Sequence, residues 1–175
     1  MDSTIKIKFT IASAEGVELL QNLTAQRFLE LHQSQIQPSH ITDFVTEKYS
    51  GEFIITELND FTNQFLVVYV DDEPAGYALL KEKGEVPQQL TDKKIGYLRN
   101  FEILGRYDQT NAGQLLLDKC LSVFKSFDAI VAVTKTQNSS MQSLLRNRGF
   151  EKHSDSSFFI NSNEIPAEML VLNLR

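Results

Sequence analysis

The spacing of apolar residues predicts an N-terminal strand followed by helices. In the stretch TIKIKFTIAS, apolar and polar residues alternate, which is the period of a half-buried strand. The apolar positions of this predicted strand are Ile5, Ile7, Phe9 and Ile11. A helix is predicted from about Ala14 to His32, where apolar residues recur at roughly helical spacing. Two shorter helices are predicted over residues 38–49 and 51–60.

The middle of the chain carries strand patterns. The runs FLVVYV (65–70) and AGYALLKE (75–82) flank the turn DDEP, which favours a β-hairpin. A polar loop over residues 83–94 then leads to the apolar stretch IGYLRNFEIL, which predicts a further strand at 95–104. A short polar turn follows, and it opens directly onto a helix. The apolar stripe of that helix is formed by Leu117, Cys120, Leu121 and Phe124.

The last part of the chain alternates strand, helix and two strands. The β-branched run AIVAVTK (129–135) is typical of a fully buried, parallel-type strand. Met141, Leu144 and Leu145 mark the next helix. Asn138 is its predicted N-cap, and Gly149 suits its C-terminal end. Strands are predicted over 150–160 and 168–175. This order predicts a mixed α/β domain with a parallel strand pair at the centre of its sheet.

Composition narrows the class of protein. A chain of 175 residues with 42% apolar and 23% charged residues is expected to form one globular domain over residues 1–175. No apolar run approaches the ~20 residues of a membrane span, and the N-terminus alternates, so we expect a cytoplasmic protein with no membrane partner. Cys120 stands alone, which excludes an intramolecular disulfide and favours core packing. The net charge of −6 argues against nucleic acid and is compatible with cationic small molecules.

The stretch LGRYDQTNAGQLLL (104–117) is the first candidate for chemistry. A strand, a turn and a helix in this order can hold phosphate groups, because the first helical N–H groups have no intrahelical partner. Only one glycine, Gly113, lies in the turn. Asn111 and Gln114 also resemble a capping box, so an ordinary helix start is the competing interpretation.

Residues 64–150 resemble the GNAT superfamily of acyl-CoA-dependent N-acetyltransferases. The hairpin FLVVYVDDEPAGYALL and the strand-turn-helix FEILGRYDQTNAGQLLLDKCL support the resemblance. The most distinctive segment is VAVTKTQNSSMQSLLRNRGFEK, in which a buried strand is followed by Asn, a short amphipathic helix and Gly-Phe. The resemblance implies a mostly antiparallel sheet of roughly seven strands flanked by helices, with a central parallel pair that splays apart.

The resemblance also implies where acetyl-CoA would bind as co-substrate, without a metal. The acyl-CoA would lie in the splay, with its pantetheine arm against the first strand and its pyrophosphate over the turn. The cofactor-binding residues implied are Phe101, Ile103, Leu104, Gln109, Thr110, Asn111, Ala112, Gly113, Gln114 and Asn138.

The turn departs from the family pattern at two of three positions. The usual pattern has Gln or Arg, then Gly, then Gly or Ala, where this chain has Asp108, Asn111 and Gly113. Asn is the best substitute for Gly in left-handed geometry, so Asn111 is compatible with the turn. A carboxylate about 6 Å from a phosphate would cost roughly 3 kcal/mol, so either Asp108 points away or a neighbour such as Arg106 compensates.

The proton-handling residues of the family are also missing. Many members have Glu at the position of Tyr97 and Tyr at the position of Leu145. The nearest candidate catalytic residues here are Tyr97, Glu102 and His153, with His40 a weaker candidate. Competing interpretations are a solvated strand histidine for His153 and a charge on the opposite pleat for Glu102.

Two functions of different classes remain from the sequence. The first is an N-acetyltransferase that uses acetyl-CoA and a small primary amine in a ternary complex, with direct attack of the amine. The second is a degenerate domain that binds CoA, a metabolite or a protein without catalysis. Positioning alone can supply roughly 7–11 kcal/mol, so the missing acid and base do not exclude the enzyme, which we favour. A homodimer is compatible with the sequence.

Overall fold

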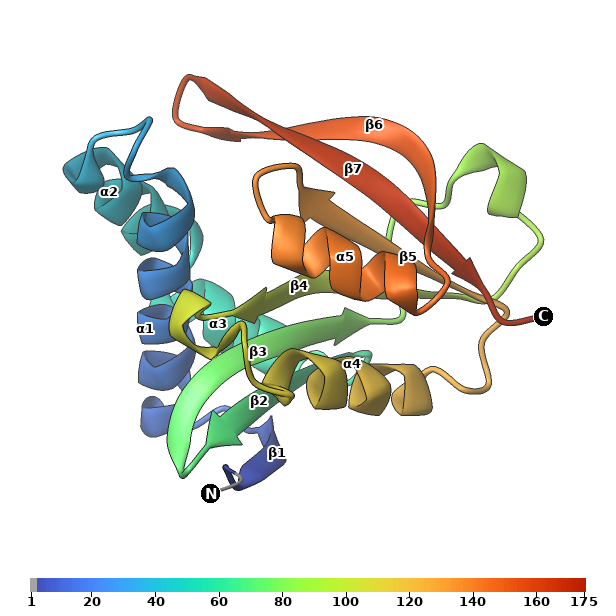
Figure 1. Cartoon of the computed structure of the whole chain (residues 1–175), viewed down its shortest axis with the longest axis horizontal. Coiled ribbons are helices and arrows are strands. Elements are labelled where there is room, and N and C mark those ends of the chain that lie inside the picture. Colours follow the sequence, from blue (N-terminus) through green and yellow to red (C-terminus); the bar gives the residue numbers. More distant parts are fainter. Residues whose placement is uncertain (1–2) are drawn as a thin grey trace.

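The computed structural model describes residues 3–175 as one mixed sheet flanked by helices (Figure 1). Every predicted strand and helix is present, and the long helix has the predicted ends. In chain order the elements are β1 (Ile5–Thr10), α1 (Ala14–His32), α2 (Pro38–Lys48), α3 (Gly51–Asn59), β2 (Asn63–Val70), β3 (Glu73–Lys81), β4 (Ile95–Ile103), α4 (Ala112–Val123), β5 (Ala129–Lys135), α5 (Ser139–Asn147), β6 (Glu151–Ile160) and β7 (Asn163–Asn173). Short 3₁₀ turns lie at Gln88–Leu90 and Gly105–Tyr107.

The sheet has seven strands over these residues, in the order β1-β2-β3-β4-β5-β7-β6. Neighbouring strands are antiparallel except β4 and β5, which run parallel. The parallel pairing extends only from Ile95–Leu98 on β4 to Ala129–Ala132 on β5. Beyond it, β4 continues beside β3 and β5 continues beside β7. The predicted fold class and the divergence of the parallel pair are therefore confirmed.

A β-bulge on β4 changes the direction of the side chains near the splay. Leu80 of β3 pairs with Leu98, but Leu79 pairs with Asn100, so Arg99 is an extra residue in the ladder. The insertion shifts the side-chain alternation by one position. Glu102 therefore lies on the same sheet face as Tyr97, and the interpretation of Glu102 as a charge on the opposite pleat is wrong.

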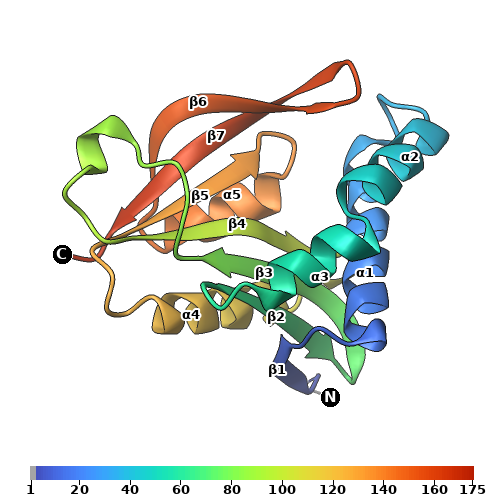
Figure 2. The same cartoon turned by 180° about the vertical axis from the view of Figure 1, so that it is seen from behind.

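Helices cover both faces of the sheet. One face packs against α4 and α5, and the other packs against α1 and α3 (Figure 2). Cys120 of α4 is 1% exposed in the first of these cores, as its place on the apolar stripe predicts. The tip of the β6–β7 hairpin reaches α1 and α2, where Ile160 and Ile165 pack with Phe28 and Phe44. This contact covers one side of the region where β4 and β5 diverge.

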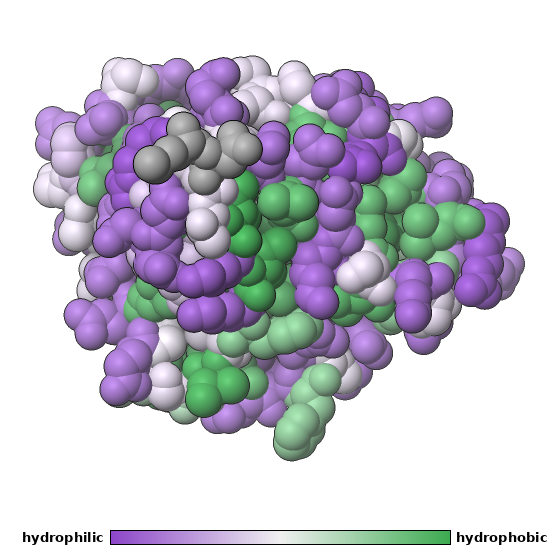
Figure 3. Space-filling view, turned by 60° about the horizontal axis from the view of Figure 1, so that its bottom comes forward, coloured by the Kyte–Doolittle hydropathy of each residue, from purple (hydrophilic) through white to green (hydrophobic). Residues whose placement is uncertain are grey.

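The first strand is less buried than its alternation predicts. Ile5 and Ile7 pack on the core, but Phe9 is 53% exposed and Ile11, which follows the strand, is 73% exposed. The reason is that β1 is the edge strand, and its pairing with β2 ends at Thr10. On the face shown in Figure 3, apolar groups lie among polar ones. Within residues 3–175, no helix is both long and apolar enough to span a bilayer.

Candidate active site

The separation of β4 and β5 leaves a free strand edge in the middle of the sheet. From Asn100 to Ile103, β4 is paired on the β3 side, while its pairing with β5 has already stopped at Leu98. We call this opening, between residues 99–103 and 133–135, the splay. Backbone groups on a free edge can hydrogen-bond an extended ligand as an added strand would.

The start of α4 lies beside this free edge. The backbone N–H groups of Asn111, Gly113 and Gln114 have no hydrogen-bond acceptor among residues 3–175. The Ala112 N–H donates to Thr110 Oγ1 at 3.2 Å, and that hydroxyl donates to the Tyr107 carbonyl. Unpaired N–H groups and the helix dipole together favour an anion at this position.

The capping interpretation of this turn is wrong. Asn111 is the N-cap of α4, but its side chain makes no capping hydrogen bond, so no capping box forms with Gln114. The backbone of Asn111 has a φ of −78°, which is outside the left-handed region. The preceding 3₁₀ turn brings the chain into the helix without left-handed geometry. Asn111 therefore uses neither its capping side chain nor its tolerance of a positive φ.

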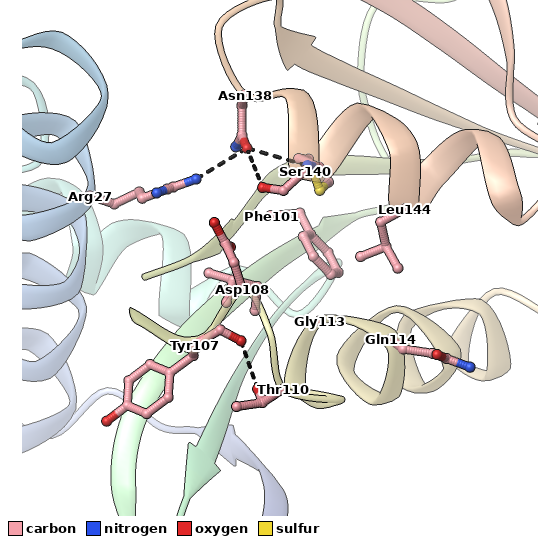
Figure 4. Close-up of a pocket in the computed structure, with 12 residues that line it drawn as sticks. Arg27, Phe101, Tyr107, Asp108, Thr110, Gly113, Gln114, Asn138, Ser140 and Leu144 are labelled. Atoms are coloured by element: carbon pink, nitrogen blue, oxygen red, sulfur yellow. Dashed lines mark hydrogen bonds between the residues drawn. The ribbon is translucent and has the colours of Figure 1, made fainter. Parts of the chain in front are cut away.

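Asp108 points away from the start of α4. Figure 4 shows its carboxylate directed toward Arg27 and the start of α5. Burial raises the pKa of Asp108, and the Arg27 charge acts against this shift. Arg106 lies over the Tyr107 ring, with its guanidinium carbon 4.9 Å from the ring centroid. The residue nevertheless lines the cavity that Gly113 and Gln114 also line, and Arg27, not Arg106, is the cation whose charge acts on its carboxylate.

A cavity occupies the space between the start of α4, the start of α5 and β4, and we call it the α4 cavity. The predicted residues that line it are Phe101, Ile103, Thr110, Gly113, Gln114 and Asn138. Leu104 is fully buried in the core on the other face, while Gln109, Asn111 and Ala112 belong to the adjacent turn and helix start. A Cβ atom at Gly113 would lie 3.2 Å from Leu144, so glycine allows α4 and α5 to approach closely here.

Asn138 connects the α4 cavity to a buried polar cluster. Its side-chain oxygen caps α5 by accepting from Met141 N–H, as predicted, and it also accepts from Arg27 at 3.1 Å. Its amide nitrogen donates to Glu102 Oε2 at 3.4 Å. Arg27 and Asn138 are 5% and 4% exposed, so these contacts are shielded from water.

Glu102 is held from several sides. Lys135 Nζ donates to its Oε1, and Arg27 Nε lies 3.5 Å from its Oε2. Arg27 also pairs with Glu30, which accepts from the Gly105 N–H. The cluster thus ties α1 to both strands of the splay, and both carboxylate oxygens of Glu102 have partners.

A second cavity of about 510 Å³ lies on the other side of the splay, and we call it the aromatic cavity. Its aromatic lining comes from α1, α2 and the residue after it, β4 and β6. These residues are Phe28, Phe44, Tyr49, Phe101, Phe158 and Phe159. Lys135 Nζ lies 4.7 Å and 5.6 Å from the ring centroids of Phe28 and Phe158. Burial, and then the charge of Glu102, raise the pKa of Tyr49 to about 12.

The three predicted catalytic residues do not lie together. Glu102 lines the aromatic cavity. Tyr97 is 3% exposed in an apolar cluster below the splay, and burial raises its pKa. His153 is exposed at a bulge of the outer strand β6. His40 is exposed in the first turn of α2, where its carbonyl accepts from Asn161.

Arg27, Tyr49 and Lys135 are site residues that the sequence reasoning missed. Arg27 carried a signal, since it follows Leu23 and Thr24 at helical spacing on the buried face of α1. Lys135 ends a buried strand, where a charge needs a partner. Tyr49 ends α2 and offered no comparable signal. Within residues 3–175, no group of three or more His, Cys, Asp or Glu residues is arranged to hold a metal ion.

Solved structures of acetyltransferases share this fold. The PaiA N-acetyltransferase from Thermoplasma acidophilum, in complex with coenzyme A, is 19% identical with a TM-score of 0.71, over 94% of this chain and 98% of that one. A probable acetyltransferase from Staphylococcus epidermidis is 14% identical with a TM-score of 0.72, over 98% of this chain and 100% of that one. A GNAT-family acetyltransferase from Streptococcus pneumoniae is 13% identical with a TM-score of 0.66, over 98% and 100% of the two chains.

The sequence itself carries the family assignment. The model of the acetyltransferase (GNAT) family matches residues 17–150, which is most of the chain and includes both strands of the splay. This chain therefore belongs to the GNAT acetyltransferase family.

Proposed function

We propose that this protein transfers an acetyl group from acetyl-CoA to the primary amine of a small molecule, by direct attack in a ternary complex. One observation carries the proposal: the α4 cavity and the aromatic cavity meet at the splay, where Phe101, Asn138 and Met141 line both. A thioester entering from one side would meet an amine entering from the other. The volume of the aromatic cavity suits a small molecule.

The α4 cavity fits acyl-CoA in two ways. The free edge of β4 can pair with the amide groups of the pantetheine arm, and the N–H groups at the start of α4 can hold the pyrophosphate. The CoA complex of the Thermoplasma protein, which has the same fold, supports this use of the cavity.

Glu102 is the candidate that best fits proton transfer. During attack a C–N bond forms, the C–S bond breaks, and the proton lost by the amine balances the proton gained by the CoA thiolate. Glu102 lines the aromatic cavity and is hydrogen-bonded to Asn138, which lines both cavities, but its oxygens are held by Lys135, Arg27 and Asn138. It would accept the proton by exchanging one of these partners, directly or through water.

The first test is acetyl-CoA binding, measured by thermal shift and calorimetry. We expect Gly113→Val to weaken binding, because the branched side chain would press on Leu144 and narrow the cradle. Gly51→Val is the matched control, since a Cβ there meets only Val17 at 3.6 Å, far from the α4 cavity along the chain. Equal acetyl-CoA affinity in wild type and Gly113→Val would contradict pyrophosphate binding at the start of α4.

The second test is thiol release from acetyl-CoA with a panel of primary amines. We expect Glu102→Gln to lower kcat/KM by about 10²-fold without changing CoA affinity, the usual effect of losing one proton-transfer group. CoA binding without thiol release for any amine would instead favour the non-catalytic binding domain.

A further inference from the structure

The aromatic cavity continues outward into a groove of about 540 Å³, which we call the outer groove. The residues that line both are Phe44, Lys48, Tyr49, Arg99 and Asn100. Arg99 and Asn100 are the two residues at the β4 bulge. The bulge interrupts the regular alternation of β4, and Arg99 lies where the aromatic cavity and the outer groove join. We call this joining region the passage.

The carboxylates that line this passage all have partners. Glu102 is paired with Lys135 and Arg27, and Glu57 is paired with Lys81 at 2.7 Å. Asp60 accepts from the backbone N–H and the hydroxyl of Thr62, which lowers its pKa. Within the described chain, Asp60 has only these neutral donors and keeps its negative charge, but it lines the outer groove and not the aromatic cavity, and the charges of Lys83 and Lys81 act on it.

Arg99 is different. Its guanidinium has no carboxylate within ion-pair distance among residues 3–175 and lies over the Tyr97 ring, 5.3 Å from the centroid. Lys83, which lines only the outer groove, also has no carboxylate within ion-pair distance in that part of the chain, although its charge acts on Asp60. A guanidinium presents a planar fork of donors that matches a carboxylate or phosphate. Stacking on Tyr97 holds the fork in place.

The same cavity disfavours an acceptor with a second positive charge. The position over Phe28 and Phe158, where an ammonium ion would gain cation–π stabilisation, is already taken by Lys135. A diamine in the aromatic cavity would therefore meet Arg99 with its distal ammonium, whereas Asp60, the lining carboxylate that forms no ion pair in the described chain, lines only the outer groove. A distal anion would find a free cation instead.

From these observations we infer that the acceptor is an amine that carries an anionic group, held by Arg99 while the amine reaches the splay. This inference rests on the proposed function, since it names the acceptor class of that site. Arg99 and Glu102 are three residues apart on an extended strand, so their Cα atoms are separated by roughly 10 Å, which sets the scale of the acceptor.

The experiment compares three acceptors of one length: 6-aminohexanoate, hexylamine and 1,6-diaminohexane. Binding to the CoA-saturated protein is measured by calorimetry, and acetylation is measured by thiol release. A three-carbon set of 3-aminopropanoate, propylamine and 1,3-diaminopropane tests a shorter reach. We expect the amino acid of at least one set to bind about tenfold tighter than its neutral analogue, with the diamine weakest. The preference should shrink as salt is raised.

Arg99→Gln should remove this preference and leave the affinity of the neutral amine unchanged, while Arg99→Lys should keep part of it. Lys125→Gln is the control, because Lys125 is exposed after the end of α4 and its loss removes one positive charge elsewhere. It should change neither the preference for the amino acid nor the affinity of the neutral amine. Equal or tighter binding of the diamine, no binding of any acceptor, or an unchanged preference in Arg99→Gln would overturn the inference. If the preference is present but no acceptor is acetylated, the inference holds and the proposed catalytic function fails.

Discussion

Leu144 and Leu145 lie on different sides of α5. Leu145 is fully buried in the core between α5 and the sheet, whereas Leu144 lines the α4 cavity near Gly113. Successive residues of a helix point about 100° apart, which turns Leu145 toward the sheet and Leu144 toward the cavity. Of the two leucines, Leu144 lines the cavity that we propose for acyl-CoA, and Leu145 is the position that the family resemblance indicated.

Exchanging each leucine for tyrosine should separate these two environments. We expect Leu145→Tyr to lower the free energy of unfolding by about 2–4 kcal/mol, because a larger ring with an unpartnered hydroxyl would enter a filled core. Leu144→Tyr should fold like wild type and raise the turnover number, by up to roughly the 10²-fold of one placed acid. Urea unfolding and thiol release measure both variants. A stable Leu145→Tyr protein would contradict this assignment of the two faces.

His32 is a second residue whose surroundings determine its behaviour. It is fully buried, and neither ring nitrogen has a hydrogen-bond partner among residues 3–175. Burial, followed by the charge of Lys135, lowers its pKa from 6.5 to about 4. Since the folded pKa lies below the unfolded one, the neutral ring contributes its full stability above about pH 6.5, and this contribution declines as the pH falls toward 4.

A pH series should show this contribution. Between pH 7.5 and pH 5, we expect wild type to lose about 2 kcal/mol more unfolding free energy than His32→Leu, which has no titrating ring. Urea unfolding at the two pH values gives the difference, and groups common to both proteins cancel. Parallel pH profiles would mean that His32 has a similar pKa in the folded and unfolded chains.

At the level of elements, β4 and β5 diverge at the splay but remain joined by side chains. No ladder hydrogen bonds join β4 to β5 beyond Leu98 and Ala132, but Glu102 of β4 and Lys135 of β5 form an ion pair across the gap. Arg27 of α1 adds a second cation to the same carboxylate. Beyond the end of the ladder, side-chain charges therefore join the two strands across the gap.

Removing one partner of the Glu102–Lys135 pair should lower the unfolding free energy more than expected from the loss of the pair as a whole. Glu102→Gln leaves Lys135 without its carboxylate in a mostly buried site, so we expect a loss of about 3–5 kcal/mol in unfolding free energy. The double variant Glu102→Gln/Lys135→Met should lose less than the sum of the two single variants, because Arg27 keeps Glu30 as its partner. Additive losses in a double-mutant cycle would show that the pair does not couple the strands.

For the whole molecule, the negative net charge contrasts with the positive side chains that line the outer groove. The chain carries −6 overall, which on its own is compatible with cationic partners. The aromatic cavity and the outer groove, however, are lined by Arg99 and Lys83, which have no carboxylate within ion-pair distance in the described chain. Substrate charge is recognised within a few ångströms, while the field of distant exposed groups is screened beyond about 10 Å.

Cys120 reports on the unfolding of the whole core. It is 1% exposed, and burial raises the pKa of its thiol. We expect native protein to react with a thiol reagent only as fast as it unfolds globally, and denatured protein to react at once. Reagent kinetics across a urea series give the comparison. Rapid labelling of native protein would contradict the packing of α4 on the sheet, whereas slow labelling also leaves the thiol-release assay free of background from the enzyme.

The local order of the chain was determined by the sequence alone. The helix over Ala14–His32, the hairpin between β2 and β3, the Asn138 cap and Gly149, with its φ of +88°, follow from periods and end signals that act over a few residues. The parallel pair and the family also followed, because the order of elements restricts the topology.

The composition of the site was decided by tertiary structure. Arg27 and Asn138 are 111 residues apart and Glu102 and Lys135 are 33 apart, and no local pattern relates them. The bulge at Arg99 shifted the alternation of β4, which brought Glu102 to the face of Tyr97 and turned Arg99 into the passage. Periodicity assumes an uninterrupted ladder, and one extra residue reverses every assignment that follows it. Which charges meet across the splay is thus a property of the packed sheet and helices, since only their packing brings these distant positions together.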